Sequence, residues 1–128
     1  MSVQNYLSLL DMTGRNFVVL GAGQGIGAEA CHALSQAGAK VICVDSDKAR
    51  GQAIAAEVGG GALVADVTVR EDMQRVFDQA REMAGPISGI VDIVGAATTQ
   101  PLSDFDDQQW ADQYAIVLRH VFLTLQIG

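Results

Sequence analysis

The stretch from Phe17 to Ala37 constrains the fold of this chain more than any other part of the sequence. A short apolar run, FVVL (17–20), is followed by four glycines within seven residues. Apolar residues then recur at helical spacing over residues 26–37. The pattern predicts a buried strand, a glycine-rich turn and a helix in direct succession. Because glycine loses much conformational freedom on folding, such a cluster indicates that something approaches this backbone closely.

The rest of the chain repeats the alternation of strand and helix. Further strands are predicted at residues 40–44, 62–65 and 89–94, and a second helix at 47–58. Thr68 and Glu71 predict a capping box before a third helix, and Asp106 with Gln109 predicts the start of a last one. The third helix is expected to carry Val69, Met73, Val76, Phe77 and Ala80, and the last helix shows apolar spacing at Trp110, Tyr114, Val117, Leu118, Val121, Phe122 and Leu125.

Four strand–helix units predict parallel strands joined by right-handed crossovers. We therefore expect an α/β fold, a Rossmann-like doubly wound parallel sheet with strand order 3-2-1-4 and helices on both faces. A complete fold of this type continues beyond a fourth strand, so residues 1–128 are interpreted as one domain truncated after about four units. An uncovered fourth strand and an apolar last helix would favour self-association, so a homo-oligomer is expected.

Composition excludes several functional classes. The formal charge of −7, with only 8 Lys and Arg scattered along the chain, disfavours a nucleic-acid surface. No apolar run reaches membrane-spanning length, and the opening MSVQNYLSLLDMTG lacks the pattern of a secretory signal. Cys31 and Cys43 are expected to be buried thiols in a reducing compartment. No metal site is expected from them or from His32 and His120, and the expected location is the cytoplasm.

A strand, a glycine-rich turn and a helix together form the arrangement that binds a phosphate at a helix N-terminus, where free N–H groups and the helix dipole favour an anion. Gly21 is expected to turn the chain off the strand, and Gly27 to let the helix lie close to the sheet. Gly23 or Gly25 would leave room for a pyrophosphate. A tight turn without a ligand is the alternative. The predicted cofactor-binding residues of this loop are Gly21, Gly23, Gln24, Gly25, Ile26 and Gly27.

Asp45 is predicted to bind the ribose of an adenosine. It ends the second strand, where an acidic side chain can accept hydrogen bonds from ribose hydroxyls. A carboxylate there would also repel a 2′-phosphate, and Gln24 in the glycine loop is neutral, which favours NAD over NADP. Lys48 and Arg50 follow closely and leave NADP open. A helix N-cap or a solvated loop position is the alternative for Asp45.

Asp66 and Val67 end the third strand in the sequence ADVT. At that level of the sheet the carboxylate could accept a hydrogen bond from the adenine amino group, while Val67 packs on the ring. Ordinary turn chemistry at a strand end explains an Asp equally well. Both interpretations stay open.

With these residues in place, the chain resembles the short-chain dehydrogenase/reductase family almost from end to end. DMTGRNFVVLGAGQGIG is similar to that family's first strand and T-G-x-x-x-G-x-G turn. ADVT resembles its adenine-binding Asp–Val, and PLSDFDDQQWADQYAIVLRHVFLTLQ resembles its fourth-helix region. The resemblance implies an N-terminal dinucleotide-binding half, with NAD as cofactor and Gly95 among the cofactor-binding residues.

The chain also departs from the family pattern. Leu20 stands where the family usually has Thr, Asp92 begins the segment that replaces Asn-Asn-Ala before Gly95, and Val117 replaces a helical Asn. The resemblance implies catalysis by a Ser and a Tyr-x-x-x-Lys pair. The only lysines are Lys40 and Lys48, and neither lies four residues after a tyrosine, so no catalytic residue is assigned. The family would place that pair after residue 128.

Three functions follow as hypotheses. The first is the NAD-binding portion of an oxidoreductase that moves a hydride between NAD and an alcohol or carbonyl substrate in a full-length parent. The second is a non-catalytic dinucleotide-binding module. The third is an S-adenosylmethionine-dependent methyltransferase, which also uses a glycine-rich turn after the first strand and an acidic residue after the second. Gly27 and the Asp66–Val67 pair disfavour the third.

Overall fold

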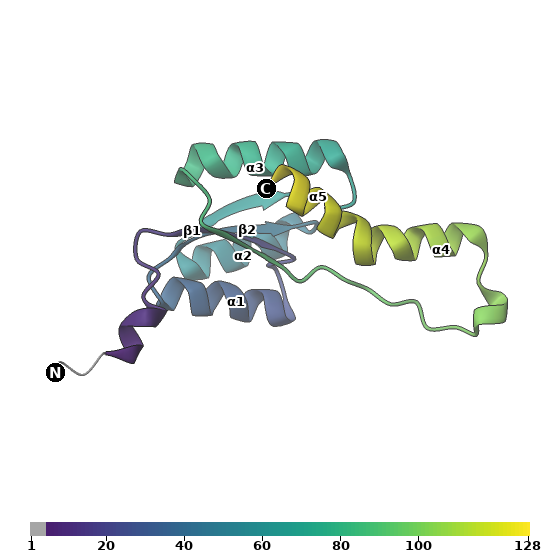
Figure 1. The fold of residues 1–128 in the computed structure, drawn as a ribbon, viewed down its shortest axis with the longest axis horizontal. Coiled ribbons are helices and arrows are strands. Elements are labelled where there is room, and N and C mark those ends of the chain that lie inside the picture. The colour runs from purple at the N-terminus through teal and green to yellow at the C-terminus, as the bar shows by residue number, and fades with distance from the viewer. Residues whose placement is uncertain (1–4) are drawn as a thin grey trace.

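The computed structural model describes residues 5–128 and contains one four-stranded sheet (Figure 1). All pairings are parallel, and the strand order is β3-β2-β1-β4. This confirms the predicted fold class and strand order. Residues 1–4, the start of the N-terminal stretch considered above, lie outside the described residues. The strands are β1 (Asn16–Leu20), β2 (Lys40–Asp45), β3 (Gly61–Val64) and β4 (Gly89–Asp92).

Helices cover both faces of this sheet (Figure 1). The first two lie on one face, and the third and the last lie on the other, as a doubly wound fold requires. Among residues 5–128 no helix is long and apolar enough to cross a membrane. The helices are α1 (Gly25–Gln36), α2 (Lys48–Val58), α3 (Arg70–Ala84), α4 (Asp107–Tyr114) and α5 (His120–Ile127), with a π-helical turn (Ala115–Arg119) between the last two and 3-10 turns at Tyr6–Leu10 and Leu102–Asp104.

The core consists of two apolar layers separated by the sheet. Successive strand residues point to opposite faces, so a strand covered on both sides is apolar throughout. One layer packs α3 and α5 on the sheet and contains Val18, Leu20, Ile42, Val44, Met73, Val76, Phe77, Ala80 and Leu123. The other packs α1 and α2 and contains Val19, Ala22, Cys31, Val41, Cys43, Ile54 and Ala55. Of the apolar residues expected on the third helix, Met73, Val76, Phe77 and Ala80 are buried, whereas Val69 is the N-cap and is 39% exposed. Both cysteines are buried and form no disulfide, and the Cys43 thiol donates to Cys31 Sγ at 3.7 Å.

The strand register brings the carboxyl ends of all four strands to one edge of the sheet. Leu20 of β1 pairs with Val44 of β2 and with Asp92 of β4, and Val44 pairs with Leu63 of β3. The turns that leave these strands therefore meet at this edge. In open α/β sheets ligands bind outside the carboxyl ends of the strands.

The capping box predicted at Thr68 and Glu71 is wrong. The helix begins at Arg70, and its N-cap, Val69, makes no side-chain capping bond. The Thr68 hydroxyl instead donates to Asp66 Oδ1 at 2.6 Å, so it is engaged in the turn that precedes the helix. Asp and Thr side chains often form such local bonds in competition with helix capping. The second predicted box, Asp106 with Gln109, is present at the start of α4.

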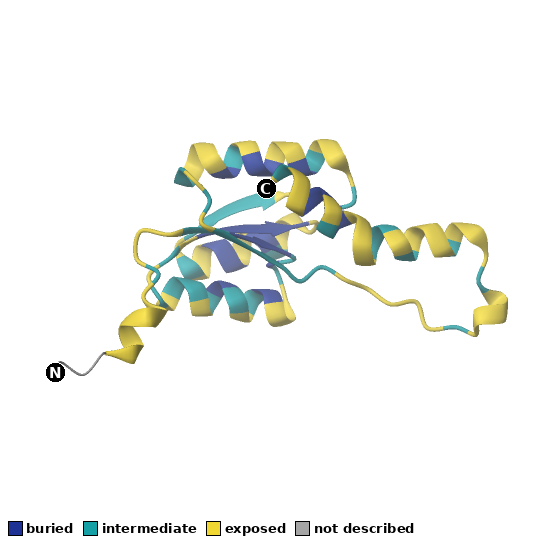
Figure 2. Cartoon of the chain, in the orientation of Figure 1, coloured by how far each residue is buried: buried dark blue, intermediate teal, exposed yellow. Residues whose placement is uncertain are grey.

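The last helical segment, made of α4, the π-helical turn and α5, packs on the sheet less closely than the other helices do. The apolar spacing predicted the helix correctly, but that stripe faces away from the sheet. Trp110 is 67% exposed and Leu125 is 83% exposed, whereas His120, Leu123 and Thr124 are buried against the sheet. Figure 2 shows α4 almost free of buried residues, projecting beyond the sheet on a long connecting segment. The segment therefore joins the core only through α5.

Leu123 and Leu125 offer a matched test of this packing, because they are the same residue type on the same helix. Leu123 is 0% exposed and Leu125 is 83% exposed. We expect Leu123→Ala to lower the free energy of unfolding by about 2–5 kcal/mol, through lost apolar burial and a cavity. Leu125→Ala is expected to lower it by less than about 1 kcal/mol. Urea unfolding measures both, and equal losses would contradict the packing of α5 on the sheet.

Candidate functional site

The glycine-rich turn is held at the carboxyl edge of the sheet by its own backbone. The N–H groups of Gly21 and Ala22 both donate to the Val44 carbonyl, at 2.9 Å each. Gly21 has φ +79° and Gly25 has φ +55°, a left-handed backbone that other residues rarely adopt. A Cβ atom at Gly27 would collide with the Gly21 carbonyl oxygen. Only a glycine at 27 lets α1 begin this close to the end of β1.

The first turn of α1 leaves backbone donors unpaired. Among the described residues, the N–H groups of Gly25 and Ile26 have no acceptor, and the Gln24 side chain makes no capping bond. The first turn of α1 also carries no acidic side chain. Free N–H groups and the positive end of a helix dipole attract an anionic ligand. A Cβ built at Gly25 would touch nothing within 4 Å, so the space beside this turn is open.

Gly23 serves a different purpose, because it receives the Asp45 carboxylate. Its N–H donates to Asp45 Oδ2 at 2.8 Å, and a Cβ at Gly23 would lie 2.6 Å from that same oxygen. Asp45 is 6% exposed and stands where β2 ends. The missing side chain at Gly23 therefore allows a buried carboxylate to contact the turn.

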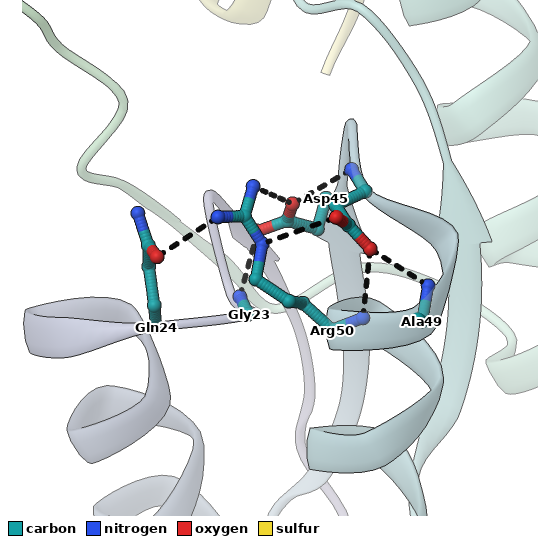
Figure 3. Close-up of polar contacts among 6 residues, drawn as sticks. Gly23, Gln24, Asp45, Ala49 and Arg50 are labelled. Atoms are coloured by element: carbon teal, nitrogen blue, oxygen red, sulfur yellow. Dashed lines mark hydrogen bonds and ion pairs between the residues drawn. The ribbon is translucent and has the colours of Figure 1, made fainter.

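Arg50 completes a polar network at the end of β2 (Figure 3). Its Nη2 donates to Asp45 Oδ1 at 3.2 Å, and its Nη1 donates to Gln24 Oε1 at 2.9 Å. Asp47 caps α2 by accepting from the N–H groups of Ala49 and Arg50, at 2.9 and 3.1 Å. The hydrogen bond from the Arg50 backbone N–H to the Asp47 carboxylate is the main reason why the pKa of Asp47 lies below its usual value. The network links the glycine turn to the start of α2.

Asp66 lies two residues after β3, at the start of a tight turn closed by the Val69 N–H bond to the Asp66 carbonyl. Its Oδ1 accepts from the N–H and the hydroxyl of Thr68, and its own N–H donates to Asp72 Oδ2 at 2.8 Å. The Arg75 side chain, hydrogen-bonded to Asp72, lowers the pKa of the Asp72 carboxyl. The Asp66 side chain is exposed, whereas Val67 is buried. Turn chemistry thus accounts for one Asp66 oxygen, and the other accepts no bond from the described residues.

These turns border one open cavity of about 490 Å³. It gathers nine of the ten predicted site residues, namely Gly21, Gln24, Gly25, Ile26, Gly27, Asp45, Asp66, Val67 and Gly95. Gly23 is not among the lining residues, and its N–H is bonded to the Asp45 carboxylate. Residues that the sequence analysis did not assign to the site also line it: Val44, Ser46, Arg50, Ala65, Ile93, Val94 and Ile116. Arg50 brings the only Lys or Arg side chain of this lining.

A buried polar cluster behind the cavity was also missed. Asp92 Oδ2 lies 2.8 Å from His120 Nδ1 and accepts from the Thr124 hydroxyl at 3.2 Å. Its Oδ1 accepts from the Val94 N–H at 3.3 Å, and Val94 lines the cavity. The cluster therefore ties the turn after β4 to α5. Asp92 and His120 lie 28 positions apart in the sequence, so no local pattern could have paired them.

The side chains expected of a catalytic pair are not assembled in this chain. Tyr114 lies at the end of α4, 53% exposed, and Val117 lies in the π-helical turn. Lys40 Nζ donates to the Met83 carbonyl, and Lys48 begins α2. Neither lysine, and neither Tyr6 nor Tyr114, lies among the cavity residues. The ionisable side chains that line the cavity are Asp45, Asp66 and Arg50.

Comparison with known proteins gives a consistent result. A family profile described as short chain dehydrogenase matches residues 15–127. Galactitol 2-dehydrogenase (L-tagatose-forming) of Cereibacter sphaeroides is 32% identical over 92% of this chain and 47% of its own length. D-threitol dehydrogenase of Mycolicibacterium smegmatis is 32% identical over 90% of this chain and 46% of its own length. The chain thus spans about half the length of the curated relatives it matches.

Solved structures of short-chain dehydrogenases have the same fold as this chain. A short-chain type dehydrogenase/reductase from Mycobacterium marinum superimposes with a TM-score of 0.90 at 29% identity, covering 97% of this chain and 52% of that protein. A 3-ketoacyl-(acyl-carrier-protein) reductase from Brucella melitensis, crystallised with NADH, shares the fold with a TM-score of 0.83 at 24% identity. Since the profile match extends over most of the sequence, this chain belongs to the short-chain dehydrogenase family.

Proposed function

We propose that this chain is the NAD-binding portion of a short-chain dehydrogenase/reductase-type oxidoreductase. The observation that carries the proposal is the cleft at the carboxyl edge of the sheet, where the unpaired N–H groups of Gly25 and Ile26 face open space. A dinucleotide is a long anion with a central diphosphate, and its size and charge suit such a cleft. Bound NAD supplies hydride transfer, and the chain supplies binding and orientation.

The glycine turn would hold the diphosphate. The N–H groups of Gly25 and Ile26 are the donors, and the bare backbone at Gly25 leaves room for the anion. Gly27 acts indirectly, because it allows α1 to begin against the Gly21 carbonyl and so aims these donors into the cleft. This division of roles keeps the diphosphate at the helix N-terminus, where the dipole favours it.

The adenosine would lie toward β2 and β3. Asp45 is proposed to accept from the ribose hydroxyls, and its Gly23 contact orients the carboxylate for this. Asp66 is proposed to accept from the adenine amino group through the oxygen that Thr68 leaves free, with Val67 packing against the ring. Gly95 lies at the opposite side of the cleft, after β4, where a built Cβ meets nothing within 4 Å. The nicotinamide half is proposed to extend in that direction.

The substrate class follows from the relatives and is proposed on that ground alone. The two relatives named above act, by their names, on galactitol and D-threitol, which are both polyols. We propose that the whole protein oxidises or reduces a hydroxylated substrate of this kind at one carbon. A Tyr–Lys pair outside this sequence would supply the proton transfer. The two free, buried cysteines suit a reducing compartment, and the cytoplasm is the proposed location.

Calorimetric titration with NADH and with S-adenosylmethionine tests the proposal directly. We expect NADH to bind, because the cleft has a diphosphate-sized anion site next to a ribose-binding carboxylate. S-adenosylmethionine has no phosphate and should bind more weakly. Tighter binding of S-adenosylmethionine would replace the oxidoreductase assignment with a methyltransferase.

Gly27→Val is expected to abolish NADH binding. The new side chain would collide with the Gly21 carbonyl and push the first turn of α1 away from the end of β1. Glu29→Val is the control, since it places the same β-branched residue at an exposed position of the same helix. Circular dichroism establishes that both variants fold, and calorimetry measures binding. Unchanged affinity in a folded Gly27→Val chain would remove the role proposed for this glycine.

The exposed apolar face of α4 and α5 is proposed to mediate homo-oligomer formation. Tyr114, Leu118, Phe122 and Leu125 border one shallow apolar groove on it. We expect the double variant Leu118→Glu, Leu125→Glu to sediment as a monomer at concentrations where the unmodified chain associates, because buried unpaired charges oppose association. Leu102→Glu is the control, as Leu102 is 81% exposed, close to the 83% of Leu125, but lies before α4. A monomeric unmodified chain would contradict the proposal.

A further inference from the structure

The His120 ring makes one hydrogen bond among residues 5–128, and that bond reaches the end of a strand. The side chain is 2% exposed and lies at the start of α5, directly after the π-helical turn. Its Nδ1 lies 2.8 Å from Asp92 Oδ2, whereas its Nε2 is buried with no partner among the described residues. An ionised carboxylate can only accept, so Nδ1 carries the hydrogen and donates it. The polar contact of this ring is therefore with Asp92 alone.

Asp92 depends on this donor because its carboxylate is almost buried. The side chain is 13% exposed, and a carboxylate removed from water is unfavourable unless other donors replace the water. Thr124, one turn further along α5, donates its hydroxyl to the same Oδ2 at 3.2 Å. Helix α5 thus supplies two donors to one oxygen, and an ionised Asp accepts from both at once.

The other oxygen of Asp92 holds the turn that follows β4. Asp92 Oδ1 accepts from the Val94 N–H at 3.3 Å, and Val94 lines the cleft beside Gly95. A Cβ built at Gly21 would lie 3.0 Å from Val94 Cγ2, so this turn lies directly against the glycine turn. Both oxygens belong to one planar group. Donors that fix Oδ2 therefore also fix the direction in which Oδ1 points.

We propose that His120 is a positioning residue for the nicotinamide end of the cleft. It donates to Asp92, Asp92 accepts from the Val94 N–H, and the turn after β4 is held in place where the proposed nicotinamide half extends. Neither His120 nor Asp92 lines the cavity, so His120 acts through Asp92 and Val94 and touches no ligand. The inference rests on the proposed function and names the residue of α5 on which one end of that site depends.

Loss of the His120 donor would affect the two ends of the cleft differently. Asp92 would keep one neutral hydroxyl donor on Oδ2, and its carboxylate would turn toward water, which breaks the bond to the Val94 N–H. The turn after β4 would then no longer have a fixed position. The proposed diphosphate donors, Gly25 and Ile26, belong to α1 and would stay in place.

NADH and ADP-ribose separate these two ends. Both contain the adenosine and the diphosphate, and only NADH carries nicotinamide. Calorimetry gives the dissociation constant of each, and the ratio of the two is the readout. Partial unfolding of a variant weakens both ligands by the same factor and leaves the ratio unchanged. For the unmodified chain we expect NADH to bind about 10-fold more tightly than ADP-ribose, because the nicotinamide adds contacts.

His120→Leu and His120→Asn are a matched pair of variants. Leu and Asn have nearly the same size and shape, but Asn places an N–H₂ group near the position of Nδ1 and can still donate to Asp92. Both variants lose the Nε2 atom that has no partner. Leu123→Ala is the control for packing, because Leu123 is buried on the same helix and makes no bond to Asp92. His120→Phe, which keeps a ring without a donor, replaces His120→Leu if that variant does not fold.

We expect His120→Leu, and equally His120→Phe, to reduce the preference for NADH by about 3- to 10-fold, since the loss of a charge-assisted hydrogen bond frees the turn after β4. His120→Asn and Leu123→Ala should each leave the preference within about 2-fold of the unmodified chain, the first because the donor is kept and the second because it is independent of Asp92. Leu123→Ala lowers the stability of the fold all the same, so stability and preference are separated.

Four outcomes would overturn the inference. If the variants without a donor keep the preference, or if His120→Asn loses it equally, the bond to Asp92 does not position the turn, although NADH binding still supports the proposed function. If Leu123→Ala lowers the preference as much as His120→Leu, the packing of α5 is responsible. If the unmodified chain binds NADH no more tightly than ADP-ribose, the turn after β4 contributes nothing to binding. If neither ligand binds, the proposed function itself fails, and the inference fails with it.

Discussion

The close approach of α1 to the end of β1 is the constraint on which the rest of the site depends. It exists because Gly27 has no side chain to collide with the Gly21 carbonyl. The same turn is fixed from below by two bonds to the Val44 carbonyl of β2. These contacts fix the first helical turn, in which the N–H groups of Gly25 and Ile26 have no acceptor among the described residues. In the proposed function, this one missing side chain lets the strand–helix junction bind an anion.

Parallel register then brings the remaining groups to that junction. Because the strands all run the same way, the residues that follow each of them lie along one edge, whatever their separation in the sequence. Asp45, Asp66 and Gly95 reach the cleft in this manner, from three different strands. The buried Asp45 carboxylate accepts hydrogen bonds from the Gly23 N–H and from Arg50, whereas the proposed anion site uses other donors, the N–H groups of Gly25 and Ile26.

The features that could be predicted from the sequence are those that depend on residues close together in the chain. The strands and the glycine turn have local patterns, and all but one of the predicted site residues line the cleft. Thr68 was mispredicted because a short hydroxyl can bond either the helix or the preceding turn, and the local contact to Asp66 prevails. The Asp92–His120 contact could not be predicted, since it depends on how α5 docks on β4. Arg50 was noticed as a nearby cation, but its reach to Gln24 requires the fold.

The π-helical turn at Ala115–Arg119 has a consequence for how the two sides of the C-terminal segment are used. Such a turn holds an additional residue, and each helical residue advances the azimuth by about 100°. The side chains of α5 are consequently out of phase with those of α4. His120 and Leu123 can thus be directed inward to the sheet, while Tyr114 and Phe122 remain in solvent. Because α5 is anchored on the sheet and α4 has no buried residue, shortening this turn by one residue would leave α5 in place and rotate the side chains of α4 by about 100° around the helix axis.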